Sequence, residues 1–248
     1  MHTSNNHVDP GVLIIGAGGL GCPAALALGA GGARRIGIVD DDRVDASNLH
    51  RQVLFTDADV GEPKAVAAAR ALSRRFSALD VVPHAVRFDV TTAPELIAAY
   101  DVVIDGSDKF ATKILANDAA VLAQRPLVHA AAVGMGGQLL TVPAGGRPCY
   151  RCLFEEPPPA GVGPSCAEAG VLGPVPGVIG ALAGVEASLL LRGQAPAFVG
   201  RLLQYDSARM TLRAVPFNPN PRCAVCAAGA RIHALAAGEY PAADCAVL

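Results

Sequence analysis

The stretch "GVLIIGAGGLG", from Gly11 to Gly21, constrains the fold of this chain more than any other feature. An apolar run typical of a buried strand leads into glycines spaced G-x-G-x-x-G, and the helix-forming segment "PAALALGAGG" follows. This spacing lets backbone N–H groups and a helix N-terminus approach phosphate oxygens. A second strand, "RIGIVD", ends on Asp40, an acid placed to accept ribose hydroxyls. The pattern predicts a nucleotide-binding α/β fold, and by itself it also fits an NAD-dependent dehydrogenase.

Strands and helices alternate along the first half of the chain. Helical patterns cover 62–76, 91–100 and 110–124, and strand patterns cover 80–88, 101–108 and 126–133. This alternation predicts a Rossmann-like, doubly wound and mainly parallel sheet. After Gly134 the pattern changes to antiparallel strands, separated by a Pro-rich loop and a helix over 177–193.

We therefore expect one domain over 11–226, with a short polar segment (1–10) before it and a tail (227–248) after it. The nucleotide-binding half is expected over about 11–134, and a partner-docking half over about 135–226.

Four of the seven cysteines form two C-x-x-C pairs, "CYRC" (Cys149 and Cys152) and "CAVC" (Cys223 and Cys226). Each pair lies on a turn-like stretch beside a proline, and two such knuckles supply the four thiolates of a tetrahedral Zn²⁺ site. Because four protein ligands leave no open position, the zinc would be structural. The alternatives are two unrelated pairs of cysteines or a redox C-x-x-C.

Composition excludes several classes of function. The chain has 248 residues, of which 52% are hydrophobic and 17% charged, and its net charge is −2. It therefore has no basic footprint for nucleic acid or an anionic membrane surface. The N-terminus lacks the order of a signal peptide, and the most apolar stretch, 178–191, is too short to span a bilayer and contains Glu186. We expect a cytoplasmic protein without a membrane or nucleic-acid partner.

The segment "DASNLHRQVLF" distinguishes ATP from NAD as the ligand. It places Asn48, Arg51 and Gln52 just after the ribose-binding acid, and Lys64 follows at the start of a helix. Two cations suit a polyphosphate, whereas an NAD site must accommodate a nicotinamide. Asp108 follows a buried strand at the sheet edge where ligands bind, and an acid beside phosphate is well placed to hold Mg²⁺. ATP with Mg²⁺ fits this set better than NAD does.

Several motifs in combination carry a family resemblance. They are "GAGGLGCPAALALGAGG", "DDDRVDASNLHRQVLF", "VGEPKA", "DGSDKFATK", "PCYRCLF", "CAEAGVLGPVPGVIGALAGVEA" and the terminal C-x-x-C. Together they resemble the adenylyltransferases that activate ubiquitin-like sulfur carriers, which are relatives of the ubiquitin-activating enzymes. The resemblance runs from Gly11 to Cys226 and is closest to the molybdopterin-synthase branch, with the thiamine-pathway branch also similar.

The resemblance implies a reaction and a role for each site residue. The carboxylate of the C-terminal glycine of a carrier attacks the α-phosphorus of ATP, which gives an acyl-adenylate and pyrophosphate. Arg51 would stabilise charge as pyrophosphate leaves, and Asp108 would bind Mg²⁺. The remaining nucleotide-binding residues would be Gly18, Gly19, Asp40, Asn48, Gln52 and Lys64.

Cys166 matches the family position that can take part in sulfur or thioester chemistry. It follows a Pro/Gly-rich stretch, and an incidental loop cysteine remains the alternative, since adenylation needs no thiol. Sequence alone cannot supply the neighbouring cation that a reactive thiolate would require.

Three departures from the family pattern stand out. The ten residues before Gly11 lack the Arg expected to reach the partner subunit's ATP. Lys109 replaces the usual Asn after the metal-binding acid. Lys113 replaces a common Arg, so that a bidentate phosphate contact would be lost.

The resemblance also implies partners. We expect a small β-grasp sulfur carrier ending in Gly-Gly, a homodimer, and a separate sulfur donor such as a cysteine desulfurase or a rhodanese-like protein. The alternatives are a docking module without ATP turnover, an adenylating enzyme that acts on a peptide or a modified tRNA, and the NAD-dependent dehydrogenase.

Overall fold

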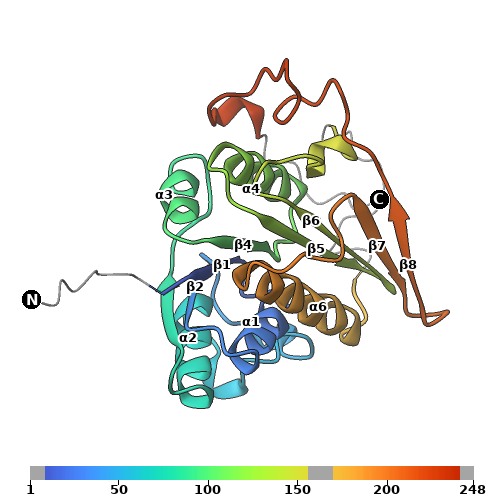
Figure 1. The fold of residues 1–248 in the computed structure, drawn as a ribbon. Helices are drawn as coiled ribbons and strands as arrows, with labels where there is room; N and C mark the ends of the chain where they lie inside the picture. Colours follow the sequence, from blue (N-terminus) through green and yellow to red (C-terminus); the bar gives the residue numbers. More distant parts are fainter. Residues whose placement is uncertain (1–8, 156–169, 241–248) are drawn as a thin grey trace, which may run out of the picture.

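A computed structural model describes residues 9–155 and 170–240. Its centre is one eight-stranded sheet with the strand order β3-β2-β1-β4-β5-β6-β7-β8 (Figure 1). The strands are β1 (Gly11–Ile15), β2 (Arg35–Val39), β3 (Asp80–His84), β4 (Val102–Asp105), β5 (Leu127–Val133), β6 (Gly136–Val142), β7 (Arg201–Asp206) and β8 (Thr211–Pro216). All pairings from β3 to β5 are parallel, and those from β5 to β8 are antiparallel. The predicted mainly parallel sheet with an antiparallel extension is confirmed.

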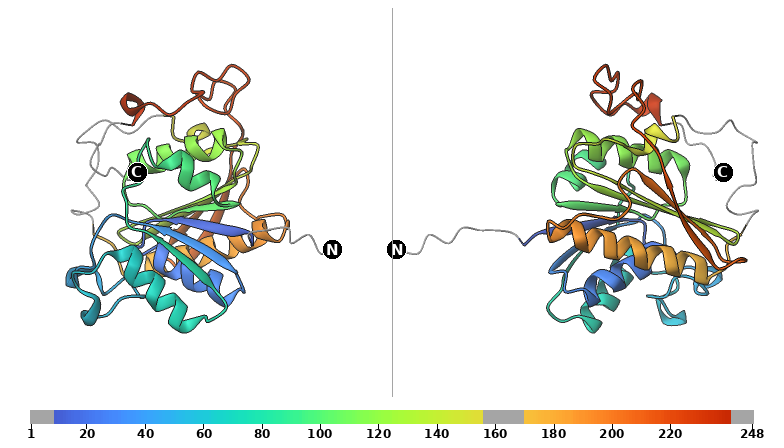
Figure 2. Two further views of the ribbon diagram at one scale, coloured as in Figure 1. Left: turned by 90° about the vertical axis from the view of Figure 1, so that its left-hand side faces the viewer. Right: turned by 45° about the vertical axis from the view of Figure 1, so that its right-hand side comes forward.

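Helices cover both faces of the sheet (Figures 1 and 2). One apolar core joins the sheet to α1 (Gly21–Ala30), α2 (Lys64–Arg75) and α6 (Pro174–Leu191). A second core on the other face joins it to α3 (Ala93–Ala98), α4 (Phe110–Leu122) and the cysteine knuckles. Strand β1 is buried along its whole length, as a strand covered on both faces must be.

Helix α6 is, by length and composition alone, apolar enough to cross a membrane. It packs instead against α1: a Cβ at Gly180 would lie 2.2 Å from the Leu20 carbonyl oxygen, and one at Gly184 would lie 2.7 Å from the Ala27 Cβ. The buried Glu186 carboxylate accepts hydrogen bonds from Thr141 Oγ1 and from two backbone N–H groups that follow the helix. These close contacts make α6 a core helix.

Strand β8 differs from the rest of the sheet, because all six of its residues are exposed. It is the last strand in the sheet order, and neither face is covered by the residues that the structure describes. Leu212 and Val215 lie on it as exposed apolar side chains, and Met210 lies in the turn before it. This edge of the described sheet is therefore open to solvent.

The chain beyond β8 crosses back over α4 (Figure 2). It carries the second cysteine knuckle, followed by the short helix η4 (Ala237–Glu239). Tyr240 is the last residue that the structure describes. Ile232 is buried in the α4-side core, so part of the segment that sequence assigned to a tail packs against the domain.

Candidate functional site

A pocket of about 740 Å³ lies at the carboxyl edge of the parallel strands. Ile15 pairs with Val39 on one side and with Asp105 on the other, so β1, β2 and β4 end at the same level. The loops that follow these strands therefore meet, as ligand-binding loops do in open α/β sheets. All of the predicted nucleotide-binding residues line the pocket: Gly18, Gly19, Asp40, Asn48, Arg51, Gln52, Lys64 and Asp108.

The three glycines of the turn have separate structural roles. Gly16 has φ +91°, in the left-handed region that only glycine adopts at little cost. A Cβ at Gly21 would lie 1.8 Å from the Gly16 carbonyl oxygen, so the close approach of helix α1 to β1 requires glycine. A Cβ at Gly18 would meet nothing within 4 Å, which leaves its backbone open toward the pocket. This is the arrangement in which a phosphate can approach the turn.

The segment from Asp45 to Gln52 holds its polar side chains by local bonds. The Asp45 carboxylate accepts hydrogen bonds from the backbone and hydroxyl of Ser47, which lower the pKa of Asp45. One turn later, Arg51 Nη2 donates to Asn48 Oδ1 at 2.5 Å. The Arg51 guanidinium is thus oriented by a neighbouring amide at the edge of the pocket, as a phosphate-binding cation would need to be.

Gln52 supplies a buried atom that lacks a partner. Its side chain lines the pocket and is buried, and its Oε1 has no hydrogen-bond partner within the residues described. A buried acceptor left unpaired is costly, and such atoms commonly point to an absent ligand or water. The observation fits a ligand that brings a donor, such as a ribose hydroxyl or a metal-bound water.

Lys64 is already engaged by a neighbour. Its ammonium lies 2.8 Å from the exposed carboxylate of Asp42, and its own side chain is buried. Asp40, next along the strand end, accepts hydrogen bonds from the backbone N–H groups of Ala17 and Asp42. Burial raises the pKa of Asp40, while these bonds and the Lys64 charge oppose the rise. The strand end therefore carries an ordered acid that joins the glycine turn to Lys64.

Asp105, which the sequence analysis missed, organises the loop that carries Asp108. It is fully buried at the end of β4 and accepts from Ser107, His129 and Lys113. Burial by itself raises the pKa of Asp105, but the Lys113 ammonium and the bonds from His129 and Ser107 hold it well below its usual range. The sequence did carry a signal for Asp105, since it is the first acid of "DGSD" and lies at the carboxyl end of a predicted strand.

Lys113 is not a phosphate-binding residue. Its ammonium is buried below the pocket, where it lies 3.2 Å from Asp105 Oδ2 and donates to the Ala130 carbonyl at 2.7 Å. The ammonium is directed toward β5 and the end of β4, so in this structure it offers no phosphate contact of the kind that an Arg was expected to make here. Lys109, by contrast, lines the pocket beside Asp108.

The four predicted zinc ligands come together on the other side of α4. The sulfur atoms of Cys149, Cys152, Cys223 and Cys226 all lie within 4.8 Å of one another. Individual Sγ–Sγ separations are 3.9 Å for Cys149–Cys152, 3.5 Å for Cys149–Cys223 and 3.4 Å for Cys152–Cys226. A tetrahedral Zn²⁺ with Zn–S bonds of about 2.3 Å needs separations of about 3.8 Å, so the cluster fits this metal.

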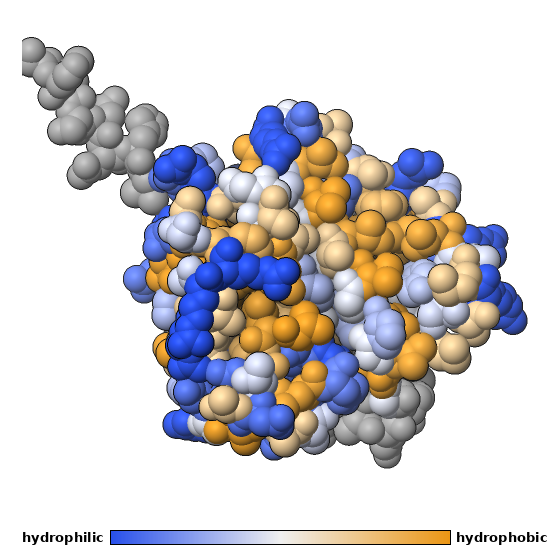
Figure 3. Space-filling view, turned by 90° about the horizontal axis from the view of Figure 1, so that it is seen from below, coloured by the Kyte–Doolittle hydropathy of each residue, from blue (hydrophilic) through white to orange (hydrophobic). Residues whose placement is uncertain are grey.

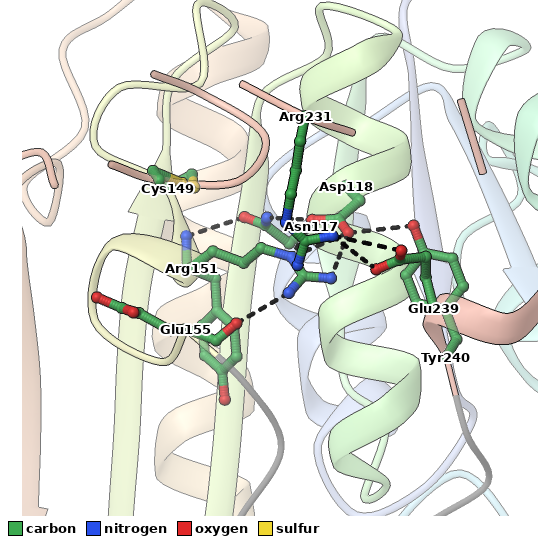
Figure 4. A network of polar contacts seen from close by, with 10 residues as sticks. Asn117, Asp118, Cys149, Arg151, Glu155, Arg231, Glu239 and Tyr240 are labelled. Atoms are coloured by element: carbon green, nitrogen blue, oxygen red, sulfur yellow. Dashed lines mark hydrogen bonds and ion pairs between the residues drawn. The ribbon is translucent and has the colours of Figure 1, made fainter. Parts of the chain in front are cut away.

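A polar network links the first knuckle to α4 (Figure 4). Arg151, between the two knuckle cysteines, makes a bidentate pair with the fully buried Asp118 at 2.8–3.0 Å. Arg151 also donates to the Glu155 carbonyl, and Asn117 accepts from the Tyr150 backbone. These bonds fix the knuckle turn on the helix that also forms one side of the pocket.

Sequence reasoning missed a second part of the pocket lining. The loop after β3 contributes Arg87, Phe88, Asp89 and Val90, and the chain after the second knuckle contributes Ala237 and Tyr240. The loop could have been found, since it follows a parallel strand at the same edge. The C-terminal residues carried no such signal. Cys166 lies outside the described residues.

Comparison with known proteins assigns the chain to a family. The ThiF family model matches residues 8–225. This chain belongs to the ThiF family. It is 46% identical over 220 residues to the sulfur carrier protein adenylyltransferase of Thermus thermophilus, covering 87% of this chain and 81% of that one. A crystal structure of E. coli MccB shares the fold, with a TM-score of 0.78 at 23% identity, covering 88% of this chain and 67% of that one.

The chain also matches a longer relative in part. It is 48% identical over 216 residues to the Bos taurus adenylyltransferase and sulfurtransferase MOCS3, which covers 87% of this chain and 48% of that protein. The chain thus spans about half the length of this relative. Family membership and relatives of this kind make this ThiF-family chain an enzyme, an adenylyltransferase, and adenylyl transfer implies the use of ATP. The dehydrogenase alternative gains no support from them.

Proposed function

We propose that this ThiF-family enzyme adenylates the C-terminal glycine carboxylate of a small ubiquitin-like sulfur carrier. The observation that carries the proposal is the pocket itself, which brings the glycine turn, Arg51, Lys64 and Asp108 together at one sheet edge. The names of the relatives support the carrier as substrate, since one acts on a sulfur carrier protein. The product would be an acyl-adenylate, ready for later conversion to a thiocarboxylate.

In the proposed reaction a carboxylate oxygen of the carrier attacks the α-phosphorus of ATP. The bond from that phosphorus to the bridging oxygen breaks, and pyrophosphate leaves with the electron pair. The chain supplies position and charge: the turn at Gly18 and Gly19 holds phosphate, Asp40 holds the ribose, and Arg51 and Lys64 neutralise developing charge. The transfer needs no protein nucleophile. Burial raises the pKa of the nearby Cys22 thiol to about 12, which makes it unsuited to that role.

Two metal ions belong to the proposal. Asp108, exposed in the pocket, is the carboxylate that would hold Mg²⁺, which would neutralise phosphate charge when bound. The four clustered thiolates would hold one structural Zn²⁺. The zinc would tie the middle of the chain to its C-terminal part and would take no part in the chemistry.

The carrier would dock on the antiparallel half, over about 135–226, and thread its tail toward the pocket. The exposure of β8 on both faces, with Leu212 and Val215 accessible, supports this surface. A homodimer is proposed on another face. Viewed from below, apolar residues cover a broad area on the side where α1 and α6 lie (Figure 3), and Val178 and Val185 of α6 are exposed. A separate protein would donate the sulfur.

The decisive experiment is the intact mass of candidate carriers ending in Gly-Gly, incubated with the enzyme, ATP and Mg²⁺. An AMP adduct on an intact carrier, absent from a copy without the last glycine, is the expected result. Arg51→Ala should lower carrier-dependent pyrophosphate release about 10²–10³-fold, since it removes charge stabilisation at the leaving group. Arg74→Ala, an exposed cation at the end of α2, is the matched control. Carrier binding without an adduct would favour the docking module instead.

A further inference from the structure

The chain beyond the second cysteine knuckle returns to the nucleotide pocket. Two backbone N–H groups after the knuckle, those of Arg231 and Ile232, donate to the Ala224 carbonyl and turn the chain back over α4. Arg231 then pairs with Glu239 at 3.3 Å across the short helix η4. The segment so folded brings Tyr240 to the pocket, which it lines together with Ala237.

The Tyr240 ring is held by a buried acid. Its hydroxyl donates to Asp118 Oδ2 at 3.1 Å, and burial together with this neighbouring carboxylate raises the pKa of Tyr240, so that the hydroxyl keeps its proton. Asp118 is itself fixed from the opposite side by the bidentate Arg151 pair, as Figure 4 shows. A side chain anchored in this way is a fixed part of the pocket wall.

Tyr240 lines the pocket from the α4 side of the sheet, where it packs with Phe88 against the α4-side core, whereas the glycine turn packs into the core on the other face. Gly18, Gly19, Arg51 and Lys64 make their part of the lining polar and cationic. The wall that includes Tyr240 is formed by one face of α4, where Leu115 lines the pocket one turn before Asp118, and by the loop after β3, with Phe88. With phosphates at the cationic residues and a ribose at Asp40, the apolar side chains of this wall remain as the surface for the base of the nucleotide.

The geometry points to Tyr240 as a nucleotide-binding residue, one that covers the base of ATP and is positioned by Asp118. This inference rests on the proposed use of the pocket for ATP and adds a binding element from the C-terminal segment. The same carboxylate serves the Cys149–Cys152 turn and the pocket wall, so the two are joined through one buried group. An aromatic ring against a nucleobase contributes to affinity through its area and its π-face.

The test compares a ligand with a base to one without. Dissociation constants for a nonhydrolysable ATP analogue and for tripolyphosphate are measured by calorimetry on the full chain with Mg²⁺. Tyr240→Ala should weaken binding of the analogue about five- to tenfold, the effect of losing one ring beside a base, and should leave tripolyphosphate binding unchanged. Tyr240→Phe, which keeps the ring but loses the bond to Asp118, should bind the analogue more tightly than Tyr240→Ala and no more tightly than the wild type, and should also leave tripolyphosphate binding unchanged.

His233→Ala, an exposed residue of the same segment, is the matched control and should behave as the wild type. Unchanged binding of the analogue by Tyr240→Ala would overturn the inference, as would an equal loss for both ligands. The measurement uses no carrier. A wild-type chain that binds the analogue but adenylates no carrier would remove the proposed function and leave the Tyr240 inference standing or falling on these constants.

Discussion

Two buried carboxylates lie in or near helix α4: Asp105 at the end of β4 and Asp118 within the helix. They differ in which parts of the chain they connect. Both are fully buried and each is paired with one cation. The partners of Asp105 lie close in sequence, 8 residues away at Lys113 and 24 away at His129. Asp118 accepts from its neighbour Asn117, but its other partners lie 33 residues away at Arg151 and 122 away at Tyr240. One acid shapes the loop of the active site, and the other joins distant parts of the chain.

The cations differ as well, and this decides how each pair responds when it is broken. Lys113 is a lysine, which can lose its proton when it is left buried without a partner. Arg151 cannot, because a guanidinium stays protonated in proteins. The Asp118 pair is therefore the one whose loss should leave an uncompensated buried charge. Four measurements test this contrast.

Metal removal should produce the largest effect, because the knuckle held by Arg151 depends on it. Stripping zinc with a chelator should lower the free energy of unfolding by about 5 kcal/mol, if free zinc is otherwise held about 10⁴-fold above its dissociation constant. Urea unfolding with and without chelator measures this, beside elemental analysis for one zinc per chain. Cys22→Ala, outside the cluster, should keep its zinc. A chain that unfolds identically in both conditions would refute the zinc site.

Asp118→Asn should produce the second-largest loss of stability. It leaves the buried Arg151 guanidinium without its counter-charge, which should lower the free energy of unfolding by about 3–5 kcal/mol. The midpoint of urea unfolding measures the loss. Arg209→Ala breaks an exposed pair with Asp206 and serves as the control, for which we expect no resolved change. A loss no larger than the control's would show that Arg151 finds another partner.

Asp105→Asn should destabilise the chain less than Asp118→Asn does, but it should lower the activity more. Because Lys113 can shed its proton, the free energy of unfolding should fall by only about 1–3 kcal/mol. The loop that carries Asp108 loses its anchor, and a small displacement there should lower kcat about 10²-fold. Pyrophosphate exchange and urea unfolding on the same preparation separate the two effects. If Asp105→Asn proved the more destabilising change of the two acids, the contrast between lysine and arginine would be wrong.

The smallest effect concerns pH. Burial lowers the pKa of His129, against the opposing pull of Asp105, so the folded chain resists a proton that the unfolded chain accepts. The contribution of His129 is therefore complete above about pH 6.5, its unfolded value, and is lost as pH falls toward the lower folded value. Between pH 7 and 5 the wild type should lose at most about 1.4 kcal/mol per pH unit from this group. His129→Gln should flatten that slope, and His233→Gln should not.

Asp105 and His129 contribute to stability over different pH ranges, so their contributions can be measured separately. The pKa of Asp105 is depressed in the folded state, so its contribution is present above its unfolded value of about 3.9 and is lost only below that. A slope that persists in His129→Gln between pH 7 and 5 would have to come from another group.

Sequence predicted the parallel half well because its rules are local. Strand–glycine–helix spacing placed Gly16, Gly18 and Gly21, and the paired C-x-x-C motifs placed the thiolates that the structure gathers. The partners of Lys113 were not predicted, because its direction depends on how α4 docks on β5, which no local pattern encodes. Tyr240 was missed because its contact with Asp118 spans 122 residues and is made only after the chain recrosses α4.

The single acid in the most apolar helix ties the burial of α6 to segments on both sides of it in the sequence. The Glu186 carboxylate has its hydrogen-bond donors only when β6 supplies Thr141 and the chain through Phe198 is in place. Until then α6 carries an unsatisfied carboxylate on the face it must bury, and docking is opposed. A growing chain that ends short of Phe198 would thus keep the apolar face of α6 exposed to solvent, which makes that face a site for chaperone binding during synthesis.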